Sequence, residues 1–152
     1  MPTGKAPDQI QPKSLDDYLE VMSKAIFQSG MSWKVVEAKW PGTREAFQEF
    51  NVYEVAAFSD LDIEALVKDT RVIRNGRKLA AIVGNAQKML ELDREYGSFQ
   101  QYLRTHGGFG ETLAALKKDF KFMGPTGSYF FLYVVGEEVP PHEEFEATYR
   151  KK

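Results

Sequence analysis

The sequence predicts an all-α fold, a compact bundle of about eight short helices. Apolar residues recur at helical spacing through most of the chain, residues that favour helix starts precede these stretches, and glycine or proline follows them. The one segment with strong strand propensity, SYFFLYVV at 128–135, has no second strand to pair with. We therefore interpret this segment as a buried helix.

In the first half of the chain, helix starts and stops follow one another closely. LDDYLEVMSKAIFQSG carries two aspartates in its first turn and an apolar stripe from Leu15 to Ile26, as an amphipathic helix does. SWKVVEAKW, REAFQEF, NVYEVAAF and LDIEALVKD are expected to be further helices. The expected caps are Ser14, Thr43, Asn51 and Ser59 or Asp60, and the expected stops are Ser29-Gly30 and Pro41-Gly42.

The second half opens with the longest helical pattern, NGRKLAAIVGNAQKMLELDREYG, which ends near Gly97. Asn75-Gly76 at its start is interpreted as a turn. Asn85 is polar in the middle of this helix, and we expect its side chain to fix a neighbouring loop by hydrogen bonds. SFQQYLRTH and residues 111–118 are predicted to be short helices, and Pro125 to open the last helix, which closes at Gly136.

Composition restricts the classes of site that the chain can contain. It has no cysteine and only two histidines, so we expect no metal, no cofactor and no thiol chemistry. No apolar run approaches the length of a membrane span, and we expect a cytoplasmic protein without a membrane partner. The formal net charge of −2 means that nucleic-acid binding would depend on local basic patches.

Residues 1–14 differ in character from the rest of the chain. MPTGKAPDQIQPKS lacks the apolar stretch of a secretory signal, and we expect it to be a flexible tail. Residues 15–152 are expected to form a single domain, because no linker or internal repeat divides them.

The stretch FKFMGPTGSYFF, residues 120–131, joins two of the predicted helices and suggests a phosphate-binding turn. Pro125 stands where a helix would begin, with its first amide N–H groups unpaired, and Gly124 would let an oxygen approach them. Phe120, Phe122 and Met123 are expected to anchor the turn in the core. Lys117, Lys118 and Lys121 add positive charge. An ordinary turn between two core helices is the alternative on this pattern alone.

Four segments of the chain resemble the 3-methyladenine DNA glycosylase I family. They are FQSGMSWKVV, RVIRNGRKLAAIVGNA, YGSFQQY and LKKDFKFMGPTGSYFF, and they occur in the family's order across residues 15–142. The resemblance implies a helix-hairpin-helix glycosylase fold and, as partner, double-stranded DNA that contains a damaged base. It also implies extrusion of the damaged nucleotide into a pocket between aromatic side chains.

The resemblance assigns roles to individual residues. Trp33 would stack on the flipped base, with Gln28 and Ser32 close by; a core tryptophan is the alternative. The backbone around Lys121, Phe122, Met123, Gly124, Pro125 and Thr126 would hold a phosphate. Arg74 and Arg77, in the basic run of Arg71 to Lys78, would contact the DNA backbone unless the run is only a solvated loop. Thr126 stands where bifunctional relatives carry a lysine, so no lyase step is expected.

The chain also departs from the family pattern. Ala25 occupies the position of the pocket glutamate, and the family's N-terminal aromatics are missing, which we expect to widen the cavity. Of the zinc ligands only His142 matches, because Glu146 replaces the last cysteine, so no zinc site is expected. Glu143 and Glu144 are the candidate catalytic acids, with a solvated acidic cluster as the alternative. Further candidates are Asp16, Asp17 and Glu37, with helix-capping or surface charges as the alternative.

These features predict a monofunctional DNA glycosylase of base excision repair, acting as a monomer on an alkylated base that is 3-methyladenine-like or bulkier. Replacement of the pocket glutamate by Ala25 keeps a second hypothesis open, a non-catalytic DNA-binding or damage-recognition module. A third hypothesis is a helical interaction protein that no longer binds DNA.

Overall fold

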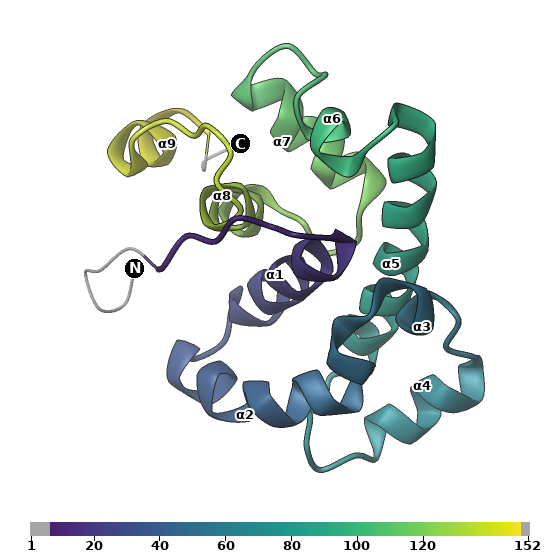
Figure 1. Cartoon of the computed structure of the whole chain (residues 1–152). Helices are drawn as coiled ribbons and strands as arrows, with labels where there is room; N and C mark the ends of the chain where they lie inside the picture. The colour runs from purple at the N-terminus through teal and green to yellow at the C-terminus, as the bar shows by residue number, and fades with distance from the viewer. Residues whose placement is uncertain (1–6, 150–152) are drawn as a thin grey trace.

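The computed structural model describes residues 7–149, which form nine α-helices, one short 3₁₀ helix and no strand. At the centre lies α1 (Leu15–Gln28), which packs against α8 (Pro125–Val134) on one side and α5 (Gly76–Tyr96) on the other (Figure 1). The all-α prediction is therefore confirmed, and 128–135, interpreted as a buried helix, falls almost entirely within α8.

The remaining helices surround these three. Three short helices pack on α5, with α3 and α4 near its start and α6 near its end. Helices α7 and α8 form a helical hairpin. Their bounds are α2 (Trp33–Ala46), η1 (Gln48–Phe50), α3 (Val52–Ala56), α4 (Asp60–Val67), α6 (Phe99–Leu103), α7 (Phe109–Asp119) and α9 (His142–Thr148).

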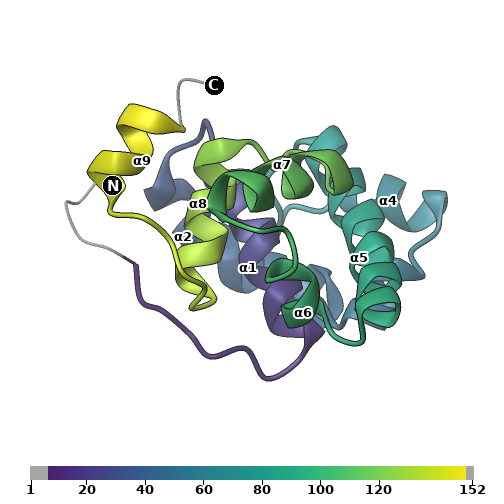
Figure 2. The ribbon, with the colours of Figure 1, turned by 90° about the horizontal axis from the view of Figure 1, so that it is seen from above.

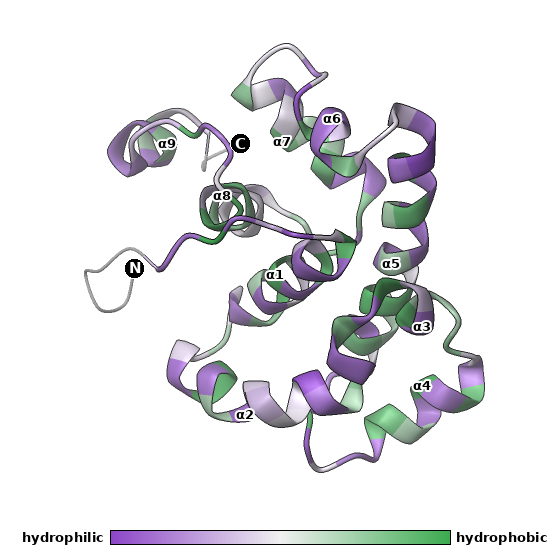
Figure 3. Ribbon diagram, in the orientation of Figure 1, coloured by the Kyte–Doolittle hydropathy of each residue, from purple (hydrophilic) through white to green (hydrophobic). Residues whose placement is uncertain are grey.

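The core is made by the apolar faces of α1, α5 and α8, as Figure 3 shows by their hydrophobic colouring. Leu19, Ile82 and Phe131, one from each helix, are completely buried. Burying a side chain of this size stabilises the fold by about 1.5–3 kcal/mol. The core therefore fixes α8, and with it the hairpin and the cavity described below.

Of the predicted helix caps, Asn51 and Ser59 are present, whereas Ser14 precedes α1 without a side-chain cap hydrogen bond. The side chains of Asn51, Ser59 and Ser98 each accept a hydrogen bond from the first turn that follows. The interpretation of Asn75-Gly76 as a turn is wrong, because the Asn75 side chain accepts from Lys78 N–H at 3.1 Å and caps α5. An Asn before an apolar stripe serves as a cap as readily as a turn residue.

Pro41-Gly42 does not stop the second helix, contrary to expectation. α2 runs through Pro41 to Ala46, and the Thr43 hydroxyl donates to the Lys39 carbonyl instead of capping a new helix. Val36, Trp40 and Thr43 are all buried, so packing of this face carries the helix past the proline. The segment predicted as REAFQEF thus becomes the end of α2 and η1.

The sequence did not predict helix α9. It begins directly after two prolines, and three of its seven residues are glutamates, so its periodicity is weak. One buried residue, Phe145, holds it in place by stacking on Tyr129 of α8 with ring centroids 4.4 Å apart.

The first described residues pass along the end of α8 (Figures 1 and 2). Ile10 N–H donates to the Val134 carbonyl at 2.8 Å, and the Gln9 side chain donates to the Tyr133 carbonyl at 2.9 Å. Of the predicted tail 1–14, residues 1–6 lie outside the described range. In the part of the chain that the structure describes, no helix is long and apolar enough to cross a membrane.

Candidate functional site

The turn between α7 and α8, residues 120–124, points one aromatic side chain into solvent. Phe120 and Met123 are buried as predicted, but Phe122 is 46% exposed, so the prediction that it anchors the turn is wrong. Phe122 has a φ of 63°, in the left-handed region that non-glycine residues rarely adopt. The chain reverses direction at this residue, and its side chain turns outward as a consequence.

Asn85 of α5 holds this turn by its backbone. Its Nδ2 donates to the Lys121 carbonyl at 3.1 Å, and its Oδ1 accepts from Lys121 N–H at 2.9 Å. The Ser128 hydroxyl donates to the Met123 carbonyl at 3.3 Å and ties the turn to α8. The expectation that Asn85 fixes a neighbouring loop is confirmed. The loop is the hairpin turn.

The start of α8 leaves its backbone open on the outer side. Pro125 is the first helical residue, and Gly124 precedes it without a side chain that could cap the amides. A methyl group added at Gly124 would meet nothing within 4 Å, and its φ of −74° suits any residue. Packing inside the protein therefore does not require glycine here. Open amides and the positive end of the helix dipole together favour an anion.

Exposed cations surround this open helix start. Lys121 is exposed on the turn itself, and Lys117 and Lys118 are exposed in the last turn of α7. Thr126, the second residue of α8, is exposed as well. The Lys121 ammonium lies next to Gly84 of α5, 3.8 Å from the position of an added methyl group. Arg77 precedes Gly84 by two helical turns. Arg77 therefore lies on the same face of α5 as Gly84, the face that the Lys121 ammonium approaches.

The basic run of residues 71–78 divides into two kinds. The Arg71 guanidinium bonds to Asp69 at 2.8 Å and to Glu45 at 2.9 Å, and these hydrogen bonds raise its pKa. Lys78 donates to the Ser29 carbonyl, and partial burial lowers its pKa. Within residues 7–149, Arg74 and Arg77 are exposed and form no ion pair. These two remain candidates for phosphate contact.

A cavity of about 500 Å³ lies between α1, α2, α8 and the N-terminal segment. Trp33 and Phe130 form an aromatic corner of it, with ring centroids 4.6 Å apart in an edge-to-face arrangement. Gln28 also lines the cavity, and its buried Oε1 accepts no hydrogen bond from the described residues. The full lining is Pro7, Asp8, Ile10, Asp17, Glu20, Val21, Lys24, Gln28, Trp33, Glu37, Phe130 and Val134.

Two residues expected at the base pocket lie outside this lining. Ser32 is exposed and caps α2, accepting a hydrogen bond from Val35 N–H at 3.4 Å. Ala25 is buried on the side of α1 that faces α8, with its carbonyl 3.9 Å from a methyl group added at Gly127. The cavity nevertheless has an N-terminal wall, made by Pro7, Asp8 and Ile10, contrary to the expectation that this wall is missing.

Carboxylates dominate the polar lining of the cavity. Glu20 accepts from the Trp40 indole and pairs with Arg44, and Glu37 pairs with Lys24 at 2.6 Å. Asp17 accepts one backbone hydrogen bond, from Lys13 N–H at 2.8 Å, and forms no ion pair among residues 7–149. Asp16 points elsewhere and accepts from Val52 N–H. The cavity therefore favours a cationic guest.

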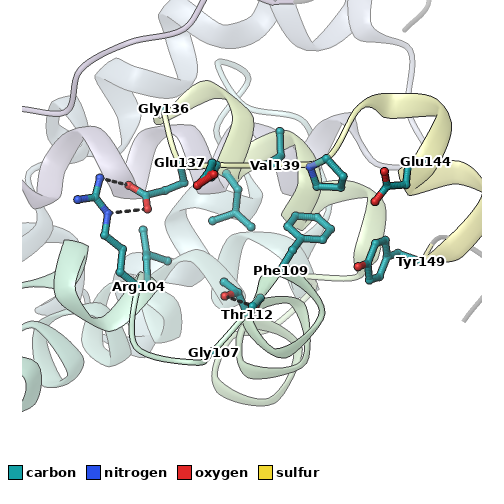
Figure 4. A pocket seen from close by; sticks show the side chains of 14 residues that line it. Arg104, Gly107, Phe109, Thr112, Gly136, Glu137, Val139, Glu144 and Tyr149 are labelled. Atoms are coloured by element: carbon teal, nitrogen blue, oxygen red, sulfur yellow. Dashed lines mark hydrogen bonds and ion pairs between the residues drawn. The ribbon is translucent and has the colours of Figure 1, made fainter.

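Glu143 and Glu144 are not part of this cavity. Both are exposed on α9, and Glu144 lines a second cavity of about 780 Å³ between α7 and the α8–α9 connection (Figure 4). Arg104 and Glu137 form an ion pair at its other end. Leu132 lines this second cavity and Phe130 and Val134 line the first, so the two lie against different faces of α8.

The structure gives no support for a metal site near α9. His142 Nε2 lies 3.4 Å from Glu146 Oε1, one turn along the helix. Within residues 7–149 no group of three or more His, Cys, Asp or Glu is placed to hold one ion. These residues do not fit a four-ligand zinc site. Aromatic packing of Phe109, Tyr129, Phe145 and Tyr149 holds this region together instead.

Comparison with known proteins identifies the family. A family model described as methyladenine glycosylase matches residues 11–113. The chain belongs to this family. This family member is 29% identical over 130 residues to DNA-3-methyladenine glycosylase 1 of Escherichia coli (strain K12), which covers 72% of this chain and 70% of that relative. The corresponding Haemophilus influenzae enzyme is 28% identical over the same shares.

Solved structures agree with the family assignment. 3-Methyladenine DNA glycosylase I from Staphylococcus aureus superposes with a TM-score of 0.73 at 25% identity, covering 84% of this chain and 79% of the other. The solution structure of a 3-methyladenine DNA glycosylase I superposes with a TM-score of 0.68 at 28% identity, covering 86% and 79%. The resemblance noted from four sequence segments and the glycosylase-like fold are thereby confirmed.

Proposed function

We propose that this methyladenine glycosylase family member is a monofunctional DNA glycosylase that removes an alkylated, cationic base after flipping it into the cavity beside Trp33. The main support for this proposal is that α8 contributes to both parts of such a site, the phosphate-binding turn and the base cavity. Its first turn is the open, lysine-flanked helix start, and its later residues Phe130 and Val134 line the aromatic, carboxylate-rich cavity. The named relatives, which are DNA-3-methyladenine glycosylases, support the same activity.

DNA binding in this proposal uses the hairpin backbone. A phosphate would accept hydrogen bonds from the amides at the start of α8, next to Gly124, while Lys121, Arg74 and Arg77 neutralise neighbouring phosphates. None of these contacts depends on base sequence. The damaged base is selected afterwards, in the cavity, where Trp33 and Phe130 provide stacking surfaces.

The chemistry is hydrolysis of the bond between the sugar C1′ and the base nitrogen. The bonding electron pair leaves with the base, which becomes neutral, and the water oxygen bonds to C1′. A carboxylate stabilises the positive charge on the sugar and takes the proton from the water. We assign this role to Asp17 in place of Glu143 or Glu144, because Asp17 lines the cavity and forms no ion pair among the described residues. Thr126 offers no amine for a lyase step.

The deciding experiment incubates the purified protein with methylated duplex DNA and measures free base by chromatography. Release of methylated adenine is the expected result. Tight binding to abasic-site DNA without release would establish the non-catalytic recognition module, the second function favoured by Ala25. Absence of any salt-dependent DNA binding would leave the helical interaction protein. We further propose that the protein is cytoplasmic and acts on DNA as a monomer. Light scattering of the complex tests the monomer, because it gives the number of protein chains bound to each duplex.

A further inference from the structure

Residues 7–10, here called the strap, form one wall of the base cavity. Pro7, Asp8 and Ile10 line it, opposite α1 and α2, while Gln9 points to the end of α8. The strap contains no helix or strand. Residues 7–10 precede the part of the chain that the family model matches, which begins at residue 11.

The strap is only weakly bound to the rest of the protein. Its two hydrogen bonds go to the carbonyls of Tyr133 and Val134, at the end of α8, where water can serve as an alternative donor. Asp8 and Gln9 are exposed, and Ile10 is 39% exposed. The wall can therefore shift without disrupting the core.

The cavity behind the strap is large enough for a ligand of drug size. Its volume of about 500 Å³ falls within the range of sites that enclose drug-sized ligands. The strap contributes the apolar side chains of Pro7 and Ile10, and Trp33 and Phe130 add aromatic surface. Asp8 and Asp17 contribute negative charge. Space, apolar surface and carboxylates together suit a cationic base that carries a large apolar substituent.

We propose that the strap sets the largest adduct that the cavity accepts, and that the preferred substrates are purines with an N-alkyl group larger than methyl. This inference rests on the proposed glycosylase function. The substituent packs against Pro7 and Ile10 while the purine ring lies at Trp33. Ile10 is the residue whose size determines how much room remains.

The test compares excision of N3-methyladenine and N3-benzyladenine from the same duplex under single-turnover conditions. The wild-type protein should remove the benzyl adduct at least as fast as the methyl adduct. Ile10→Trp should fill the cavity, lower the benzyl rate about tenfold or more and lower the ratio of benzyl to methyl rates. Ile10→Pro removes the N–H that bonds to Val134 and should raise the ratio of benzyl to methyl rates.

The matched controls are Gln11→Trp and Gln11→Pro, at an exposed residue that does not line the cavity. They should leave the ratio of the two rates unchanged. A ratio that stays the same in both Ile10 variants, or a wild type that removes only the methyl adduct, overturns the inference and leaves the glycosylase function standing. A wild type that releases neither base overturns the proposed function itself.

Discussion

The hairpin and the base cavity, which meet on α8, are built from different kinds of contact. The hairpin is a turn that Asn85 fixes by its backbone, with an open helix start at Gly124, whereas the cavity is lined by side chains from three helices and from residues 7–10. Binding of a phosphate by the backbone requires only a fixed turn and unpaired amide N–H groups. A cavity depends on each side chain that lines it. A substitution in the cavity should therefore change base removal and leave DNA binding intact.

The largest expected effect sharpens the cavity side of this comparison. Asp17→Asn should lower the single-turnover rate of base release by about 100-fold, because the neutral amide cannot take a proton from water. Affinity for undamaged duplex should not change. The exposed Glu64→Gln on α4 is the matched control.

Glu143→Gln and Glu144→Gln complete this series, because the sequence pointed to these two residues. Both should release base at the wild-type rate, since Glu144 lines the other cavity and Glu143 lines neither. A loss of rate in either variant, with normal Asp17→Asn, would return the catalytic role to α9.

The next effect tests how the hairpin turn is fixed. Asn85→Ala removes both hydrogen bonds to the Lys121 backbone and leaves a partly buried N–H and C=O unpaired. The free energy of unfolding should fall by about 1–3 kcal/mol in urea denaturation, and DNA affinity should fall with it. Gln87→Ala, which removes an exposed side-chain bond to the Ala56 carbonyl, should cost well under that amount. Equal losses for both variants would count against a special role for Asn85.

Gly124→Val separates binding from folding. An added Cβ meets nothing within 4 Å, so the unfolding midpoint should fall only slightly, by the small cost of valine at a helix N-cap. It would cover the amides at the start of α8, and duplex affinity measured by fluorescence anisotropy should fall about tenfold. Unchanged affinity would mean that the phosphate binds elsewhere.

The smallest effect concerns the left-handed residue of the turn. Phe122→Gly relieves the positive φ of 63°, which costs a non-glycine residue about 1 kcal/mol or more. Glycine's larger conformational freedom in the unfolded chain offsets part of this gain. Calorimetry should show a slightly higher melting temperature. A clear decrease would mean that the phenyl ring makes packing contacts that its 46% exposure does not suggest.

The sequence specified local features better than distant ones. Asn51 and Ser59 cap helices as predicted, and Asn85 anchors a loop as predicted, because a polar residue in an apolar stripe needs a partner. The prediction that Pro41 ends the second helix is wrong, because burial of Trp40 and Thr43 outweighs one lost backbone hydrogen bond. Helix α9 depends on a single aromatic contact, between Phe145 and Tyr129, that periodicity does not detect.

The candidate cavity was only partly predictable for the same reason. Trp33 and Gln28 follow from a family motif and do line it. Phe130 and the strap reach it from segments about 120 residues apart in sequence, and only the folded chain brings them together. Phe122 was assigned to the core because its apolar character outweighed a backbone conformation that sequence alone does not reveal.

The most direct test measures two quantities on one alkylated duplex, for the wild type, Trp33→Ala and Gly124→Val. The quantities are affinity for the undamaged duplex and the single-turnover rate of base release at saturating protein. If the hairpin and the cavity are separate devices, Trp33→Ala should lose at least tenfold in rate and keep its affinity within about twofold. Gly124→Val should lose affinity and keep its saturated rate. Loss of both affinity and rate in both variants would contradict the proposal that the two ends of α8 serve DNA binding and base removal separately.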